Sequence, residues 1–263
     1  MTNRELYKFD DFTLSNYRKL IQIAKAQGFQ FILHKDKYVS ERKDIIWRHD
    51  VEFSVEIAYE MAKIEAEEGV LTTYFFQLHC PCYNLFSIRT SSLLQKIKDL
   101  GHHIGLHFDS HYYNVQSEDE LNQFIELDRN YMNAVLGLNI DTYSFHNTNP
   151  FILSCKEYKY GGLINVYSSY FKEHYDYCAD STGIWRYERL EDKLMNPSIQ
   201  HLQVLVHDGM WSDQVLSPRK RLIKVYHDYA NELIKTYDKW LPRSGNKNVD
   251  DDCINPNSDG YEQ

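Results

Sequence analysis

The stretch IIWRHDVEFS, residues 45–54, joins an apolar run to a cluster of ionisable side chains. The run IIW is typical of a buried strand, and Asp50 and Glu52 follow where that strand should end. Ser54 then stands at the N-cap position of a helix whose apolar periodicity covers residues 55–68. The stretch therefore predicts a strand, a loop that carries two carboxylates, and a helix.

The same alternation recurs along the rest of the chain. Strands are expected at residues 29–34, 44–49, 70–77, 102–107, 141–145, 163–169, 176–180 and 202–207, and helices at 13–27, 55–68, 90–100, 117–136 and 217–241. Strands that alternate with helices favour a parallel sheet covered by helices. The predicted fold class is therefore α/β.

Composition and charge exclude several classes of protein. With 43% hydrophobic and 25% charged residues, the 263-residue chain has the composition of a folded globular protein. A net charge of -9 gives no basic surface for a phosphate backbone, so nucleic acid is not an expected partner. The sequence has neither an apolar run long enough for a transmembrane segment nor the apolar core of a secretory signal. We expect a cytoplasmic protein.

The distribution of apolar residues predicts the domain organisation. No linker-like segment interrupts residues 1–241, which we expect to form a single domain. Residues 242–263 contain almost no apolar side chains, so we expect a flexible polar tail there. The sequence does not indicate an oligomeric state.

Histidines and carboxylates recur at the ends of the predicted strands, which is where active sites of parallel α/β folds lie. These residues are His49, Asp50, Glu52, His107, His111, His146, Asp180 and His207. Each one alone is a weak signal, because most histidines and carboxylates only face solvent or satisfy local contacts. Their repeated position at one edge of the sheet indicates a site. A carboxylate with two imidazoles is a common ligand set for a catalytic divalent metal.

Three motifs in this order resemble those of the polysaccharide deacetylases, carbohydrate esterase family 4, also called the NodB homology group. The pair of acids that ends a strand is matched by Asp50 and Glu52, the His-x-x-x-His motif by His107 and His111, and the Leu-x-His motif by the segment that ends at His207. The resemblance spans residues 45–211. It implies a distorted (β/α) barrel of seven parallel strands with outer helices.

The resemblance also implies roles for these residues. Asp50 corresponds to the general base, His207 to the general acid, and Glu52, His107 and His111 to the metal ligands. The family usually has Asp where this chain has Glu52, so the roles of Asp50 and Glu52 as base and ligand can be exchanged. The metal expected at such a site is Zn²⁺, with Co²⁺, Ni²⁺ and Fe²⁺ as alternatives, because all four accept this ligand set.

Two further segments are candidates for substrate binding. SFHNTNP, residues 144–150, occupies the place of the family's Arg-x-Pro motif and offers His146 and Asn147. Arg48 or Arg186 would then take the role of the arginine that orients the base.

DSTGIWR, residues 180–186, resembles the stretch that forms one wall of the family's pocket. It contributes Asp180, Trp185 and Arg186 as candidate substrate contacts.

The function implied is metal-dependent hydrolysis of an N-acetyl group on an amino sugar, in a sub-branch that serves surface-polysaccharide biosynthesis such as O-antigen or capsule. A cytoplasmic location favours a nucleotide- or lipid-linked sugar over assembled polymer. Two alternatives stay open: hydrolysis or transfer of another acyl or amide group at the same metal site, and a non-catalytic metal-binding protein of a glycan assembly complex.

Overall fold

The computed structural model describes residues 1–249, which fall into a unit Met1–Arg221 and a second unit that begins at Leu222. The strands are β1 Gln30–Ile32, β2 Asp44–Val51, β3 Thr73–Gln77, β4 His103–Asp109, β5 Thr142–His146, β6 Lys159–Tyr160, β7 Leu163–Asn165, β8 Asp176–Ser181, β9 Ile184–Trp185 and β10 His201–His207. The α-helices are α1 Asn3–Leu6, α2 Leu14–Ala26, α3 Val55–Glu67, α4 Ile88–Asp99, α5 Glu118–Leu136, α6 Pro150–Ser154, α7 Ser169–His174, α8 Leu190–Met195 and α9 Pro218–Trp240. Three 3-10 helices are η1 Phe9–Phe12, η2 Asp208–Met210 and η3 Pro242–Ser244.

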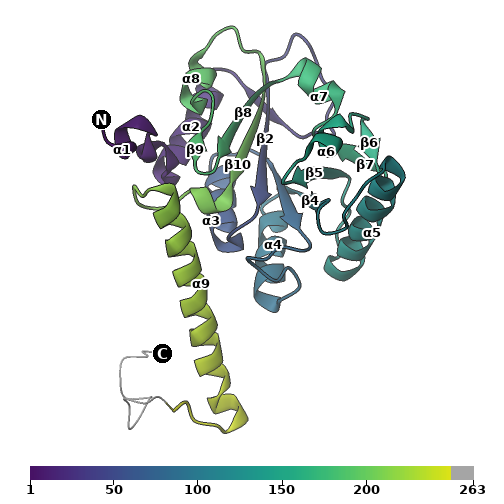
Figure 1. Ribbon diagram of the computed structural model, residues 1–263. Helices are drawn as coiled ribbons and strands as arrows, with labels where there is room; N and C mark the ends of the chain where they lie inside the picture. Colours follow the sequence, from purple (N-terminus) through teal and green to yellow (C-terminus); the bar gives the residue numbers. More distant parts are fainter. Residues whose placement is uncertain (250–263) are drawn as a thin grey trace. The chain divides into compact units, whose positions relative to one another are not determined.

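Seven parallel strands form the main sheet, in the order β7-β5-β4-β3-β2-β10-β8 (Figure 1). The short strands β6 and β9 pair antiparallel with the two outermost strands, and β1 pairs parallel with β2. Helices α3, α4 and α5 lie outside the sheet. This arrangement confirms the predicted α/β fold of the distorted (β/α)7 type. Within residues 1–249 no pairing joins β7 to β8, so the barrel has an open seam there.

Strand β2 lies inside this sheet between β3 and β10, and all eight of its residues are buried. A strand covered on both faces is expected to be almost continuously apolar, yet this one carries Arg48, His49 and Asp50. The register with its neighbours brings Asp50 beside His207 of β10, and a second pairing places His107 of β4 beside Ser144 of β5. The parallel register therefore gathers these side chains at the carboxyl ends of the strands.

His49 belongs to a buried polar network on the other face of β2. Successive side chains of a strand point to opposite faces, so His49 points away from the face shared by Arg48 and Asp50. Its Nε2 lies 2.7 Å from Oε1 of Glu65, and the other oxygen of that carboxylate, Oε2, accepts a hydrogen bond from the hydroxyl of Tyr74 at 2.6 Å. Burial alone would raise the pKa of Glu65, but the interaction with His49 helps to lower it to about 2. His49 therefore joins β2 to helix α3.

The structure has the helix starts expected at Ser54 and Ser117. The hydroxyl of Ser54 accepts from the backbone N–H of Ile57 and caps α3, and Ser117 caps α5 in the same way through Glu120. The short elements α1, α6, α7, α8, β6 and β9 were not foreseen, because segments of two to six residues are too short to show a periodicity.

The predicted domain boundary at residue 241 stays a prediction. Helix α9 is described to Trp240 and η3 to Ser244, while residues 250–263 of the expected polar tail lie outside the described residues. No helix within residues 1–249 combines the length and apolar character that a membrane crossing requires.

Candidate active site

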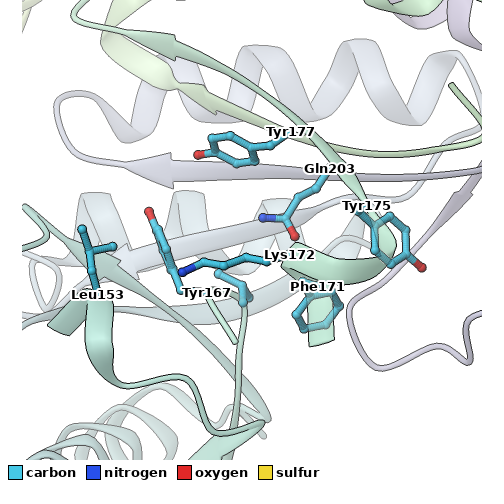
Figure 2. Close-up of a pocket in the computed structure, with 8 residues that line it drawn as sticks. Leu153, Tyr167, Phe171, Lys172, Tyr175, Tyr177 and Gln203 are labelled. Atoms are coloured by element: carbon cyan, nitrogen blue, oxygen red, sulfur yellow. The ribbon is translucent and has the colours of Figure 1, made fainter. Parts of the chain in front are cut away.

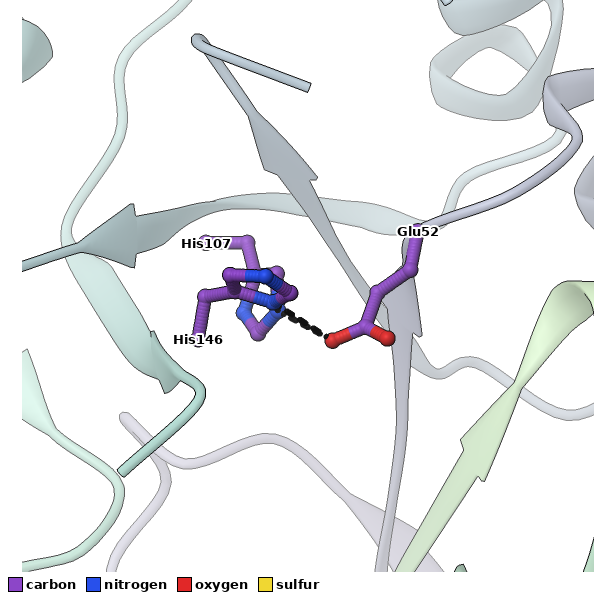
Figure 3. Close-up of side chains that lie close together, drawn as sticks. All are labelled: Glu52, His107 and His146. Atoms are coloured by element: carbon purple, nitrogen blue, oxygen red, sulfur yellow. Dashed lines mark hydrogen bonds and ion pairs between the residues drawn. The ribbon is translucent and has the colours of Figure 1, made fainter. Parts of the chain in front are cut away.

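Three side chains bring possible metal ligands together at the carboxyl ends of the strands: Glu52, His107 and His146 (Figure 3). The Oε1 atom of Glu52 lies 2.9 Å from Nε2 of His107 and 2.8 Å from Nδ1 of His146, and these two nitrogens lie 3.2 Å apart. Among residues 1–249, this is the group of histidine, cysteine and carboxylate side chains that has the spacing of a metal site. We call these three residues the Glu-His-His group.

The loop after β2 that carries Glu52 is held by Asp208. One oxygen of the Asp208 carboxylate accepts from the backbone N–H of Glu52 at 2.7 Å, and the other accepts from that of Phe53 at 3.2 Å and also from that of Ser54. Burial raises the pKa of Asp208 to about 7, although these donors act in the opposite direction. Sequence reasoning missed Asp208. Its position directly after the Leu-x-His motif was the available signal.

His107 is oriented by Ser144, its neighbour in the sheet. The Nδ1–H of His107 donates to the Ser144 hydroxyl at 2.7 Å, and that hydroxyl donates to Oδ1 of Asp50 at 3.0 Å. Because Nδ1 carries the proton, Nε2 keeps a free lone pair toward Glu52 and His146. Sequence reasoning also missed Ser144. A serine between the aromatic residues Tyr143 and Phe145 of strand β5 was the signal that could have indicated it.

Asp50 lies beside the Glu-His-His group and pairs with Arg48. The Arg48 Nη1 atom lies 3.1 Å from Oδ1 of Asp50, and both side chains are buried. Of the two arginines considered for orienting the base, the structure places Arg48 against Asp50, whereas Arg186 is exposed and lines a cavity beside the site. Asp50 thus has a fixed carboxylate next to the group, which is the geometry that a general base needs.

His207 lies across the same cavity and is fixed by Asp180. The His207 Nδ1 donates to Oδ1 of Asp180 at 2.6 Å, and the Asp180 carboxylate also accepts from the backbone N–H of His207 and from Nε1 of Trp211. Burial alone would lower the pKa of His207, but the Asp180 carboxylate raises it to about 10. His207 is therefore protonated at neutral pH. Asp180 was expected to contact the substrate, but both of its carboxylate oxygens accept hydrogen bonds from protein donors.

Replacing Asp180 by Asn is expected to shift the alkaline limb of the pH–rate profile toward neutral pH. The raised pKa keeps His207 protonated, so a reaction that needs its proton slows only as pH rises through about 10. Without the carboxylate, burial dominates and the pKa falls below its ordinary value. Profiles of kcat/KM against pH measure this shift. Asp128→Asn, another buried acid, is the matched control and should leave the limb in place.

The ligand group differs from the predicted one by one histidine. His111 is exposed, and its Nε2–H donates to the backbone carbonyl of Asn147 at 2.7 Å, away from the group. His146, expected as a substrate contact, lies within the group, and hydrogen bonding to Glu52 raises its pKa against the effect of burial. His111 as a ligand and His146 as a substrate contact stay predictions from sequence. The geometry favours His146 as the ligand.

The site opens into a cavity of about 720 Å³. Its lining includes Asp50, Glu52, Phe53, Phe145, Asn147, Thr148, Leu153, Tyr167, Tyr177, Ala179, Asp180, Ser181, Thr182, Arg186, Tyr187, Leu205, His207 and Met210. Trp185, the remaining predicted substrate contact, is absent from this lining. Its Nε1–H donates to Asp11 at 3.0 Å, and its ring stacks on Phe12 with centroids 5.1 Å apart.

The donor set fits a divalent metal with nitrogen and oxygen ligands. Burial alone would raise the pKa of Glu52, but the adjacent imidazoles of His107 and His146 lower it, so its side chain is a carboxylate. One carboxylate oxygen and two imidazole nitrogens leave positions open for water and substrate, as catalytic sites require. Zn²⁺, Co²⁺, Ni²⁺ and Fe²⁺ all accept these donors. The residues therefore fit the expected cofactor.

No protein-family model matches the sequence, and no curated protein matches it. Several solved structures are similar in fold. A family 4 carbohydrate esterase from Bacillus anthracis is 16% identical, with a TM-score of 0.46 over 81% of this chain and 90% of that one. The chitin deacetylase of Colletotrichum lindemuthianum is 14% identical, with a TM-score of 0.43 over 76% and 86% of the two chains. A family 4 pseudoenzyme from Bacillus anthracis is 13% identical, with a TM-score of 0.43 over 72% and 63%. The structural neighbours of this chain include family 4 deacetylases.

Proposed function

We propose that this chain is a metal-dependent deacetylase that hydrolyses the N-acetyl group of an amino sugar. One observation carries the proposal: the candidate base Asp50, the candidate acid His207 and Glu52 line one cavity, and His107 and His146 lie against Glu52 there. Asp50 and His207, which supply the base and the acid, also occupy neighbouring positions in the paired strands β2 and β10. Amide hydrolysis needs this combination, because water must lose a proton and the leaving nitrogen must gain one.

A divalent metal bound by Glu52, His107 and His146 would polarise the amide carbonyl and lower the pKa of an attacking water. The protein's own residues supply the remaining steps. Asp50 accepts the proton of the water as it attacks the carbonyl carbon. Its carboxylate is held by Arg48 on one side and by the Ser144 hydroxyl on the other, so its orientation is fixed before substrate arrives.

His207 donates the second proton. Attack on the carbonyl makes a tetrahedral carbon, and the C–N bond breaks only when the departing amine is protonated. A histidine whose pKa is raised to about 10 carries that proton throughout the neutral range. Asp180 holds the ring by Nδ1, so Nε2 is the atom free to donate it.

The outer part of the cavity offers polar side chains to a sugar. Asn147, Thr148, Ser181, Thr182 and Arg186 line it and supply hydroxyl, amide and guanidinium groups. Such groups match the hydroxyls of a hexosamine ring. The finer expectations are proposals: surface-polysaccharide biosynthesis rests on the resemblance of the sequence motifs, and a nucleotide- or lipid-linked precursor rests on the expected cytoplasmic location.

The proposed reaction predicts acetate release that depends on metal. Purified protein loaded with Zn²⁺ or Co²⁺ should release acetate from N-acetylated amino sugars or their nucleotide- or lipid-linked forms. Chelation should abolish the release, and added metal should restore it, because Glu52 and both histidines then regain their ion. Acetate is quantified by mass spectrometry, with intact fold verified by circular dichroism. Release that survives complete metal removal would contradict a metal-dependent reaction.

A further inference from the structure

We propose that a second cavity, beside the active site, receives an acyl chain longer than acetyl, so the preferred substrate is an amino sugar that carries a longer N-acyl group. This inference rests on the proposed amide hydrolysis and makes a longer acyl group, in place of acetyl, the one that the same site prefers to remove. It starts from an apolar cavity of about 250 Å³ that the proposed deacetylation does not use (Figure 2). We call it the side cavity.

The side cavity lies where the barrel is open, between β7 and β8. Val166 and Tyr167 come directly after β7, Phe171 lies on α7, and Tyr177 lies on β8. In Figure 2, Leu153 and Tyr167 lie toward one end of the cavity and Phe171 and Tyr175 toward the other, with Gln203 between them. The missing strand pair therefore leaves a space that side chains line but do not fill.

The lining of the side cavity is suited to hydrocarbon. Apart from Lys172 and Gln203, it consists of aliphatic and aromatic side chains. Its volume exceeds that of about 150 Å³ at which an apolar engineered cavity binds benzene. A chain of several methylene groups fits this volume and this chemistry, whereas a sugar ring would leave its hydroxyls without partners.

The side cavity adjoins the reacting groups. Leu153, Tyr167 and Tyr177 line both cavities. The guanidinium carbon of Arg48 lies 5.0 Å from the centroid of the Tyr167 ring, and Arg48 pairs directly with Asp50. Only one side chain therefore separates the candidate base from the wall of the side cavity.

The position of the side cavity indicates that the acyl chain is the part of the substrate that enters it. In an N-acyl amino sugar, the apolar arm begins at the carbonyl carbon that water attacks. The polar side chains named above, Asn147, Thr148, Ser181, Thr182 and Arg186, suit the sugar. The acyl chain is then the part of the substrate that the apolar side cavity would receive. Each methylene that leaves water should improve binding by about fourfold until the cavity is filled.

A chain-length comparison tests the inference. N-acetylglucosamine and N-hexanoylglucosamine are the two probes. Their affinities are measured by calorimetry on the metal-loaded Asp50→Asn protein, in which we expect hydrolysis to be about 10²–10⁴-fold slower. Their hydrolysis is measured on the metal-loaded wild type. We expect the hexanoyl probe to bind at least tenfold more tightly and to be hydrolysed with the higher kcat/KM.

Filling the side cavity should remove this preference. Val166 is 1% exposed and lines the side cavity, so Val166→Phe should reduce the hexanoyl-to-acetyl ratio at least tenfold. Leu153→Phe is a second filling variant at a side chain that is 41% exposed, in case the first does not fold. Leu127→Phe, in a separate cavity of about 300 Å³, is the matched control and should keep the ratio.

The outcomes separate the two proposals. Equal affinities for the two probes, no detectable binding of either, or a preference that survives both filling variants would overturn the side cavity as an acyl site, while acetate release alone would still support the deacetylase. A hexanoyl preference in binding that the filling variants abolish supports the acyl site, even if neither probe is hydrolysed. In that last case the proposed hydrolysis is the part that fails.

Discussion

Asp50→Asn is expected to lower kcat/KM for amide hydrolysis by about 10²–10⁴-fold, the usual contribution of a general base. The substitution keeps the shape of the side chain and an oxygen that accepts from Ser144, but it removes the basic carboxylate. Metal content should be unchanged, because Asp50 lies beside the Glu-His-His group and not in it. Steady-state kinetics and metal analysis on the same preparation measure both quantities.

Two comparisons decide what the loss means. Asp128→Asn removes a buried carboxylate outside the site and should keep full activity. His207→Gln should cause a loss similar to that of Asp50→Asn, because the leaving amine then has no acid. If the protein holds metal and both Asp50→Asn and His207→Gln leave its cellular phenotype intact, the chain is a non-catalytic metal-binding protein.

His146→Ala is expected to lower the affinity for Zn²⁺ by more than about 100-fold, because loss of a direct ligand should exceed the 10–100-fold cost of losing a residue that only supports one. His111→Ala should have a much smaller effect, since its ring contacts the Asn147 carbonyl outside the group. Competition titrations with a chelator of known affinity measure both changes.

A comparison of stabilities shows whether a loss of metal affinity comes from a destabilised fold. His146→Ala also removes a hydrogen bond that Glu52 accepts, so thermal unfolding of both metal-free variants must be compared with that of the metal-free wild type. Equal metal affinities for wild type and His146→Ala, with a large loss in His111→Ala, would restore the ligand set that the sequence motif implies.

The sequence carried most of the information about the fold. Apolar runs that alternate with periodic segments predicted the parallel sheet, and capping residues such as Ser54 marked the helix starts. The open seam between β7 and β8 could not be predicted, because it depends on which strand edges remain unpaired in three dimensions. The side cavity at that seam therefore could not be predicted from the sequence either.

Candidate site residues could be predicted where they stand at the end of a strand that is recognisable in the sequence. Asp50 and Glu52 share one strand end, and the strand order brings His107 and His207 to the same edge. Whether His111 or His146 lies close to Glu52 could not be predicted from residues near them in the sequence. It depends on the pairing of β4 with β5, which sets His146 beside Asp109, and on the turn at Asn147, whose φ of 44° lies in the left-handed region.

Supporting residues were the hardest part to predict. Arg48 could be assigned only once the alternation along β2 placed it on the same face as Asp50. Asp208 and Ser144 act through hydrogen bonds to the β2 loop and to His107, and partners of this kind are set by tertiary geometry. Asp180 was recognised as part of the pocket wall, but its role in holding His207 required the fold.

The central claim is that Glu52, His107 and His146 bind the metal of this protein. Anomalous scattering from a crystal grown with Zn²⁺, recorded on both sides of the zinc absorption edge, tests it most directly. The account predicts one strong peak about 2.0–2.1 Å from Nε2 of His107 and Nδ1 of His146, with a carboxylate oxygen of Glu52 completing the protein ligands. A peak bound by Asp50 and His111 without His146 would contradict it.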